Sequence, residues 1–94
     1  MSLFVVEYTY NPETSSRRDD HRGDHRGWIA EMIRRKVVRS TGPLADGTGA
    51  FIIADGPDEE TVTRLFQQDP FVQAKLVENM RVSEWHPVMG EFSE

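Results

Sequence analysis

The stretch from Arg22 to Trp28 reads Arg-Gly-Asp-His-Arg-Gly-Trp and carries the side chain best suited to proton chemistry in this chain. Its histidine, His25, precedes the apolar residues Trp28 and Ile29 by three and four positions, so we expect all three to share one helix face. An imidazole exchanges a proton near neutral pH and can serve as a general base. The alternative is a half-buried histidine with a purely structural role.

Four further residues are candidates for binding a substrate. Arg22 lies three residues before His25, on the same predicted face, where its guanidinium can hold an anionic group. Ser40, Thr41 and the Gly42 amide fall where a predicted strand ends and can bind a substrate oxygen. Simple surface exposure is the alternative for Arg22, and an ordinary strand-to-turn role is the alternative for the other three.

Metal and cofactor chemistry is not expected. His21 and His25 are four residues apart, as in helical zinc sites, but no glutamate base of the His-Glu-x-x-His kind lies between them and no third ligand is evident. The absence of cysteine excludes disulfides and thiolate ligands. Proton transfer by a histidine needs no cofactor, and we expect none.

Charge is unevenly distributed along the chain. The net charge is −5, but residues 17–39 contain eight Arg or Lys against four acids, a net of +4, which leaves −9 for the rest. Such a basic segment can steer a small anion toward itself, although a solvated helix face explains it equally simply. A pI near 5.1 argues against nucleic acid as a partner.

The length and composition indicate one globular domain that spans residues 1–94. Hydrophobic residues make up 37% of the chain and charged residues 29%, which is typical of a soluble protein. The chain has no basic-then-apolar leader, and no apolar run approaches the roughly 20 residues that cross a bilayer. We therefore expect a cytoplasmic protein that does not contact membranes.

Apolar periodicity and turn residues predict the elements of the fold. We expect strands at 3–10, 37–41, 50–54 and 77–86. A first helix is expected at about 17–36, and it opens with a capping box of Ser16 and Asp19. A second helix starts within 55–60 and is interrupted at Asp69-Pro70. We expect Gly42-Pro43 to end the second strand and Pro57 to lie in the first turn of the second helix.

This β-α-β-β-α-β order predicts an α+β, ferredoxin-like domain, in which two helices cover one face of an antiparallel four-stranded sheet. Apolar residues nevertheless occur on both faces of the first and third strands, with Phe51 and Ile53 opposite Ala50 and Ile52. Since two helices cover only one face, we predict that a second subunit covers the other, in a homodimer packed sheet to sheet.

Several motifs occur together at spacings that resemble the YciI-like (YCII-related) family. They are Phe4-Val5-Val6, the stretch Arg22 to Trp28, Gly42-Pro43-Leu44, Asp69-Pro70-Phe71 and Trp85-His86-Pro87. The match runs over nearly the whole chain, and the joint spacing is far more specific than any single motif. That family is similar to dimeric α+β-barrel proteins, which agrees with the predicted homodimer. The chain departs from the family where Gly23 replaces a common proline and where Arg35 and Lys75 replace common glycines.

The resemblance implies a His-Asp acid-base pair in a pocket near the dimer interface, and by motif position the pair falls on His25 and Asp69. The Arg-x-x-His-x-x-Trp spacing selects His25 over His21, because no aromatic residue follows His21 at three positions. Asp before Pro is also a common helix N-cap, which is the alternative role for Asp69. Both roles are compatible if one carboxylate oxygen accepts the helix amides and the other faces the imidazole.

The sequence therefore predicts a small dimeric enzyme of the lyase or isomerase kind, in which His25, oriented by Asp69, removes a proton from a small anionic or aromatic-derived substrate. The alternative is a non-catalytic ligand-binding, regulatory or accessory dimer that uses the same pocket. RNA binding is disfavoured, because the third strand lacks the basic residue and paired aromatics with which such sheets stack bases.

Overall fold

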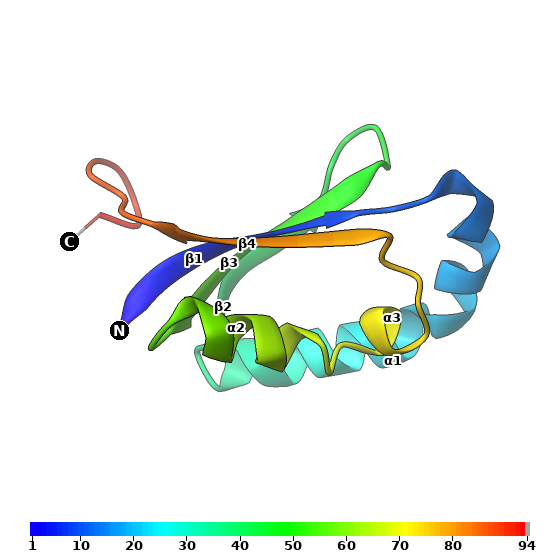
Figure 1. The fold of residues 1–94 in the computed structure, drawn as a ribbon, viewed down its shortest axis with the longest axis horizontal. Helices are drawn as coiled ribbons and strands as arrows, with labels where there is room; N and C mark the ends of the chain where they lie inside the picture. Colours follow the sequence, from blue (N-terminus) through cyan, green and yellow to red (C-terminus); the bar gives the residue numbers. More distant parts are fainter. Residues whose placement is uncertain (94) are drawn as a thin grey trace.

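Four antiparallel strands form one sheet in the order β2-β3-β1-β4, and the helices lie together on one of its faces (Figure 1). The structure, a computed structural model, describes residues 1–93. Its elements are β1 (Ser2–Thr9), the 3-10 helix η1 (Pro12–Thr14), α1 (Ser15–Arg34), β2 (Val38–Pro43), β3 (Gly49–Gly56), α2 (Glu59–Phe66), α3 (Pro70–Gln73) and β4 (Asn79–Trp85). The predicted α+β, ferredoxin-like arrangement is confirmed.

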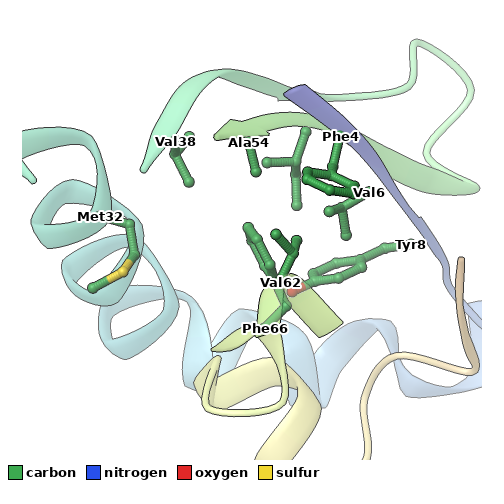
Figure 2. Close-up of a cluster of buried hydrophobic side chains, with 9 residues drawn as sticks. Phe4, Val6, Tyr8, Met32, Val38, Ala54, Val62 and Phe66 are labelled. Atoms are coloured by element: carbon green, nitrogen blue, oxygen red, sulfur yellow. The ribbon is translucent and has the colours of Figure 1, made fainter. Parts of the chain in front are cut away.

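The core forms between the sheet and the helices. Alternate residues of β1, namely Phe4, Val6 and Tyr8, are buried on the helix side, and each pairs directly with a residue of β3 that faces the same way. Figure 2 shows these side chains beside two residues of α2, Val62 and Phe66, and Met32 of α1 belongs to the same buried cluster. The Tyr8 hydroxyl points inward from the sheet, and this orientation matters for the site described below.

The opposite face of the sheet carries no helix but is partly apolar. Val5 of β1 pairs with Ile53 of β3, Leu3 pairs with Trp85 of β4, and Phe51 extends the same face. Phe51 remains 41% exposed. The predicted alternation of both strands is therefore present, and it leaves apolar side chains on a face that the helices do not cover.

The start and the buried side of α1 differ from the sequence prediction. The helix begins at Ser15, directly after η1, and its N-cap residue Thr14 makes no side-chain capping bond, so the predicted capping box is wrong. The chain instead turns at Asn11, whose side chain accepts a hydrogen bond from the Glu13 amide at 2.9 Å, and η1 then continues into α1. Ile33 lies four positions after the buried Ile29 and is expected on the same face, yet it is 50% exposed.

The second strand is longer than predicted. Gly42 and Pro43 end it as predicted, but as its last two residues, which pair with Phe51 and Ala50 of β3. Proline is tolerated there because β2 is an edge strand, where a missing N–H need not break the ladder. The strand β4 in turn begins at Asn79 rather than at 77.

The helix α2 begins within the predicted 55–60 segment, but only after Pro57. Asp58 is its N-cap, and the Asp58 side chain accepts a hydrogen bond from the Thr61 amide at 2.7 Å. Pro57 therefore precedes the helix rather than lying in its first turn. The capping carboxylate fixes the boundary, because it satisfies an amide that has no partner within the helix.

Two lysines hold the left-handed backbone conformation that glycine favours. Lys36, after α1, has φ 63°, and Lys75, after α3, has φ 60°. Lys75 is one of the positions where the sequence departs from a common family glycine. After α1 the common family glycine is replaced by Arg35, but the residue with the left-handed backbone is Lys36, one position later.

In residues 1–93 no helix combines the length and the apolar character that a membrane span requires.

Candidate active site

The helices α1 and α3 bring His25 and Asp69 into contact although 44 positions separate them in the sequence. The His25 Nδ1 lies 2.8 Å from Asp69 Oδ1 and 3.0 Å from Oδ2. The Asp69 side chain is fully buried, whereas the His25 side chain remains 17% exposed. The geometry is therefore that of an imidazole held from within by a buried carboxylate and open on its other side.

Asp69 is also the N-cap of α3. Its Oδ1 accepts the Phe71 amide at 2.9 Å as well as the imidazole, and its Oδ2 accepts the Tyr8 hydroxyl at 2.8 Å. The capping and imidazole-holding roles thus coexist, but the expected division of one oxygen to each is wrong, because Oδ1 takes part in both. The buried carboxylate is compensated by three donors, as a charge in the protein interior requires.

This arrangement fixes the tautomer of His25. A carboxylate can only accept, so the Nδ1 of a neutral His25 carries the hydrogen that Asp69 receives. The lone pair is then on Nε2. Because the His25 side chain lines a cavity of about 280 Å³, that nitrogen is the one available to a bound molecule.

Phe71 fixes the plane of the His25 ring. The two rings are stacked, with centroids 3.9 Å apart and an interplanar angle of 1°. Phe71 is buried and is anchored at the start of α3 by the Asp69 cap. One short segment, Asp69-Pro70-Phe71, therefore supplies both the hydrogen-bond partner and the stacking partner of the histidine.

Tyr8 belongs to the candidate site, although the sequence alone did not identify it. Burial raises the pKa of its hydroxyl far above the usual tyrosine range, and the charge of Asp69 and the hydrogen bond to it act in the same direction. Tyr8 is therefore neutral and remains a donor to Asp69. A signal was present in the sequence, because a tyrosine on the buried face of a strand usually needs a partner for its hydroxyl.

The cavity that His25 faces lies between α1 and the strands β2 and β3. Its wall includes an aromatic end, an aliphatic side and two arginines: Tyr10, Arg22, His25, Arg26, Ile29, Ala30, Ile33, Thr41, Gly42, Pro43, Ala50 and Phe71. Three of the four predicted substrate-binding residues, Arg22, Thr41 and Gly42, are thus in the wall. Arg26 was not among the predicted residues.

Ser40 does not line this cavity. It pairs with Ile53 and lies on the sheet face away from the helices, beside a different hollow of about 250 Å³. Arg22 lines the cavity wall, but its guanidinium donates to Asp19 at 2.8 Å and lies 6.0 Å from the Phe71 ring centroid. Arg26 forms no ion pair within residues 1–93, so its charge is the one not already engaged by a carboxylate.

Another hollow, of about 320 Å³, lies near the two ends of the chain between Leu3, Trp85 and Phe92. Its histidine, His86, is 81% exposed and lies 3.5 Å from Glu84, so no buried carboxylate orients that ring. Within residues 1–93 no three His, Asp or Glu side chains gather closely enough to hold a metal ion. Of the two hollows that a histidine lines, only the one at His25 has its imidazole oriented by a buried carboxylate.

Comparison with known proteins agrees with this fold. The YCII-related domain matches residues 2–86. The solved structure of 5-chloro-2-hydroxyhydroquinone dehydrochlorinase (TftG) from Burkholderia phenoliruptrix AC1100, in complex with 2,5-dihydroxybenzoquinone, is similar with a TM-score of 0.78 and 23% identity, covering 90% of this chain and 95% of that one. Rv0793 from Mycobacterium tuberculosis is similar with a TM-score of 0.56 and 14% identity, covering 97% of each chain. No curated protein sequence matches the chain.

Proposed function

This chain belongs to the YCII-related family, and from that premise we propose that it is a small enzyme of the lyase or isomerase kind that removes a proton from a small organic molecule. His25 is the general base, and its Nε2 accepts the proton. Asp69 orients the ring and stabilises the imidazolium that forms. The observation that carries the proposal is the 2.8 Å contact between His25 Nδ1 and buried Asp69, on a ring that lines a cavity.

The proposed chemistry follows from where the electrons go. When Nε2 takes a proton from a carbon beside a carbonyl, the C–H electron pair moves onto the carbonyl oxygen and an enolate forms. An isomerase returns a proton from the imidazolium to a different atom, whereas a lyase expels a leaving group as an anion. Both outcomes balance without an oxidant or reductant, so the proposal includes no cofactor.

The lining of the cavity supports an anionic or aromatic-derived substrate. Tyr10 and Phe71 supply aromatic rings near His25, while Arg22 and Arg26 place positive charge in the same wall. The TftG neighbour is a dehydrochlorinase whose complex holds a dihydroxybenzoquinone, a planar oxygenated ring of the kind this cavity suits. We propose that class, hydroxylated or halogenated rings and their keto forms, as the first to test.

We also propose that a second copy of the chain covers the open face of the sheet. Leu3, Val5, Phe51, Ile53 and Trp85 place apolar surface there, and exposed apolar surface of this kind is typical of subunit interfaces. Light scattering after size exclusion should give the mass of a dimer, and Phe51→Glu should give a monomer. A stable wild-type monomer at micromolar concentration would contradict this part of the proposal.

Turnover of a small panel tests the proposed reaction. Wild type, His25→Ala and His21→Ala would each be incubated with 5-chloro-2-hydroxyhydroquinone, other chlorinated hydroquinones and unchlorinated keto acids, with chloride release and absorbance spectra as readouts. We expect turnover by wild type and His21→Ala only. Binding without turnover in wild type would favour the alternative, a non-catalytic ligand-binding or regulatory dimer.

A further inference from the structure

Tyr10 lies in the wall of the cavity that His25 also lines. Its ring meets Phe71 edge-on, with centroids 6.1 Å apart and an interplanar angle of 87°, while His25 stacks on the face of the same Phe71. Within residues 1–93 no backbone or side-chain group forms a hydrogen bond with the Tyr10 hydroxyl. The oxygen of this hydroxyl is not buried either. It is therefore accessible, unlike the hydroxyl of Tyr8, which is committed to Asp69.

A buried arginine holds the Tyr10 ring. Arg18 is only 5% exposed, and its guanidinium carbon lies 4.4 Å from the Tyr10 ring centroid, in cation-π contact. The guanidinium also donates to the Asn11 carbonyl at 3.1 Å and to the Thr14 hydroxyl, in the turn that follows Tyr10. In the part of the chain that the structure describes, Arg18 makes no ion pair with a carboxylate. Its burial is therefore compensated by the tyrosine and the turn, which it ties together.

The Tyr10 hydroxyl is protonated at neutral pH, chiefly because of its burial. Burial raises the pKa of Tyr10 above the usual tyrosine range, the charge of Asp69 adds to the increase, and Arg18 and Arg22 oppose it. A neutral phenol in a cavity wall is a hydrogen-bond donor. The wall that contains it also holds an imidazole whose free nitrogen accepts a proton, so a bound molecule would meet a donor and an acceptor in the same cavity.

We propose that Tyr10 donates its hydroxyl hydrogen bond to the oxygen of an enolate or phenolate in this cavity, and that Arg18 is the positioning residue that holds Tyr10 for this role. The inference rests on the proposed function for its catalytic meaning, because the oxyanion is the species that His25 would generate. No proton leaves Tyr10, so the step requires no further reactant. The ligand class that follows is a planar molecule with an oxyanion conjugated to its ring.

Binding of 4-nitrophenol tests the proposal without any turnover. Its absorbance distinguishes phenol from phenolate, and nitrobenzene provides the same ring without the oxygen. In Tyr10→Phe, which keeps the ring and its packing, we expect the affinity for the phenolate to fall by about tenfold or more, because a hydrogen bond to a charged oxygen is lost. The affinity for nitrobenzene should not change, and His21→Ala should behave as wild type in both titrations.

Arg18 is tested by a double-mutant cycle with the same probe. Arg18→Met should weaken phenolate binding in a Tyr10 background but have little further effect in Tyr10→Phe, and Arg18→Lys should recover part of the loss. An effect of Arg18→Met that is equal in both backgrounds would reject the positioning role. Arg18→Gln is the fallback if Arg18→Met does not fold, since glutamine also removes the positive charge over the ring but can still donate to the Asn11 carbonyl.

The outcomes separate this inference from the proposed function. Equal phenolate affinity in wild type and Tyr10→Phe, or no binding of 4-nitrophenol to wild type, would overturn the role of Tyr10. Phenolate binding that depends on Tyr10, in a protein that turns over no compound of the panel, would instead keep the binding role and reject the enzyme. Turnover that Tyr10→Phe leaves unchanged would keep the enzyme and reject Tyr10.

Discussion

The tetrapeptide Asp-His-Arg-Gly occurs twice in succession on α1, at 20–23 and 24–27, and the two copies have different surroundings. The first histidine, His21, has its Nδ1 2.9 Å from the carbonyl of Arg17, one turn back on its own helix. The second, His25, reaches a buried carboxylate on another helix and stacks on Phe71. Since the local sequence is the same, the difference between them comes from what lies opposite on α3.

The same contrast extends to the arginines of the two copies. Arg22 is held by Asp19, three residues earlier on the helix, whereas Arg26 has no carboxylate partner within residues 1–93. Both line the cavity, but only Arg26 has a charge that is free for a ligand. A repeated motif therefore does not imply repeated surroundings: one turn of helix, about 5.4 Å of rise, separates a histidine that contacts its own helix from the proposed base.

The largest expected effect concerns the two histidines. If His25 is the general base, His25→Ala should lower kcat by roughly 10² to 10⁴, the range that positioned acid-base groups contribute. His21→Ala, which removes the same side chain one turn away, should leave kcat within about twofold because no substrate atom meets it. Steady-state rates on any substrate found with the panel would measure both. Equal losses in the two variants would remove the distinction between the copies.

Asp69→Ala should cause the largest loss of stability. The change removes the cap of α3 and leaves the buried Tyr8 hydroxyl without a partner, so we expect the free energy of unfolding to fall by about 2 to 4 kcal/mol. Asp24→Ala, on the exposed side of α1, is the matched control and should change it by no more than about 0.5 kcal/mol. Urea titrations followed by circular dichroism would give both values. A loss below about 1 kcal/mol for Asp69→Ala would mean that the carboxylate is not the anchor described here.

Tyr8→Phe should have a smaller effect that depends on pH. Removing the hydroxyl costs one hydrogen bond to a charged group, about 1 to 2 kcal/mol. Because burial raises the pKa of Tyr8 in the folded state, the stability it contributes is fully present below the unfolded tyrosine pKa of about 10 and is lost as the pH rises above it. Wild type should therefore lose more stability than Tyr8→Phe between neutral pH and about pH 11. Parallel losses in the two proteins would show that Tyr8 is not held neutral by its surroundings.

The glycines of the two copies provide the smallest test. A Cβ at Gly23 or at Gly27 would meet nothing within 4 Å, so neither glycine is required by close approach of this chain's own described backbone. Gly23→Ala and Gly27→Ala should each stabilise α1 by up to about 1 kcal/mol, which thermal melting would detect. Destabilisation by Gly27→Ala alone would indicate that a ligand or a partner subunit approaches the second copy.

The sequence predicted the fold because the strands alternate with period two and the turns carry recognisable residues. It did not predict the face on which Ser40 lies. Val38 is buried toward the helices, and simple alternation would place Ser40 on the same side, but a register shift between them turns Ser40 to the open face and Thr41 to the cavity. A single bulge has no clear signature in one sequence, so that residue was misplaced relative to the cavity.

The contact between His25 and Asp69 was predicted by resemblance, whereas the supporting residues were not. Tyr8, Phe71 and Tyr10 acquire their roles only because α3 packs against α1 and places Asp69 and Phe71 beside the two tyrosines. No spacing within these segments encodes that packing. Their residue types were nevertheless informative, because buried tyrosines need partners. Prediction from sequence therefore found the histidine and its carboxylate, and the structure added the aromatic residues around them.

The central claim is that Asp69 holds His25 with its proton on Nδ1 and its lone pair on Nε2. Nitrogen-15 NMR of the two histidines on α1 measures this directly, at a pH where both rings are neutral. We predict a protonated Nδ1 and an unprotonated Nε2 for His25, lost in Asp69→Ala, with His21 unaffected by that substitution. A proton on Nε2 of neutral His25, or a tautomer that does not respond to Asp69→Ala, would contradict the account.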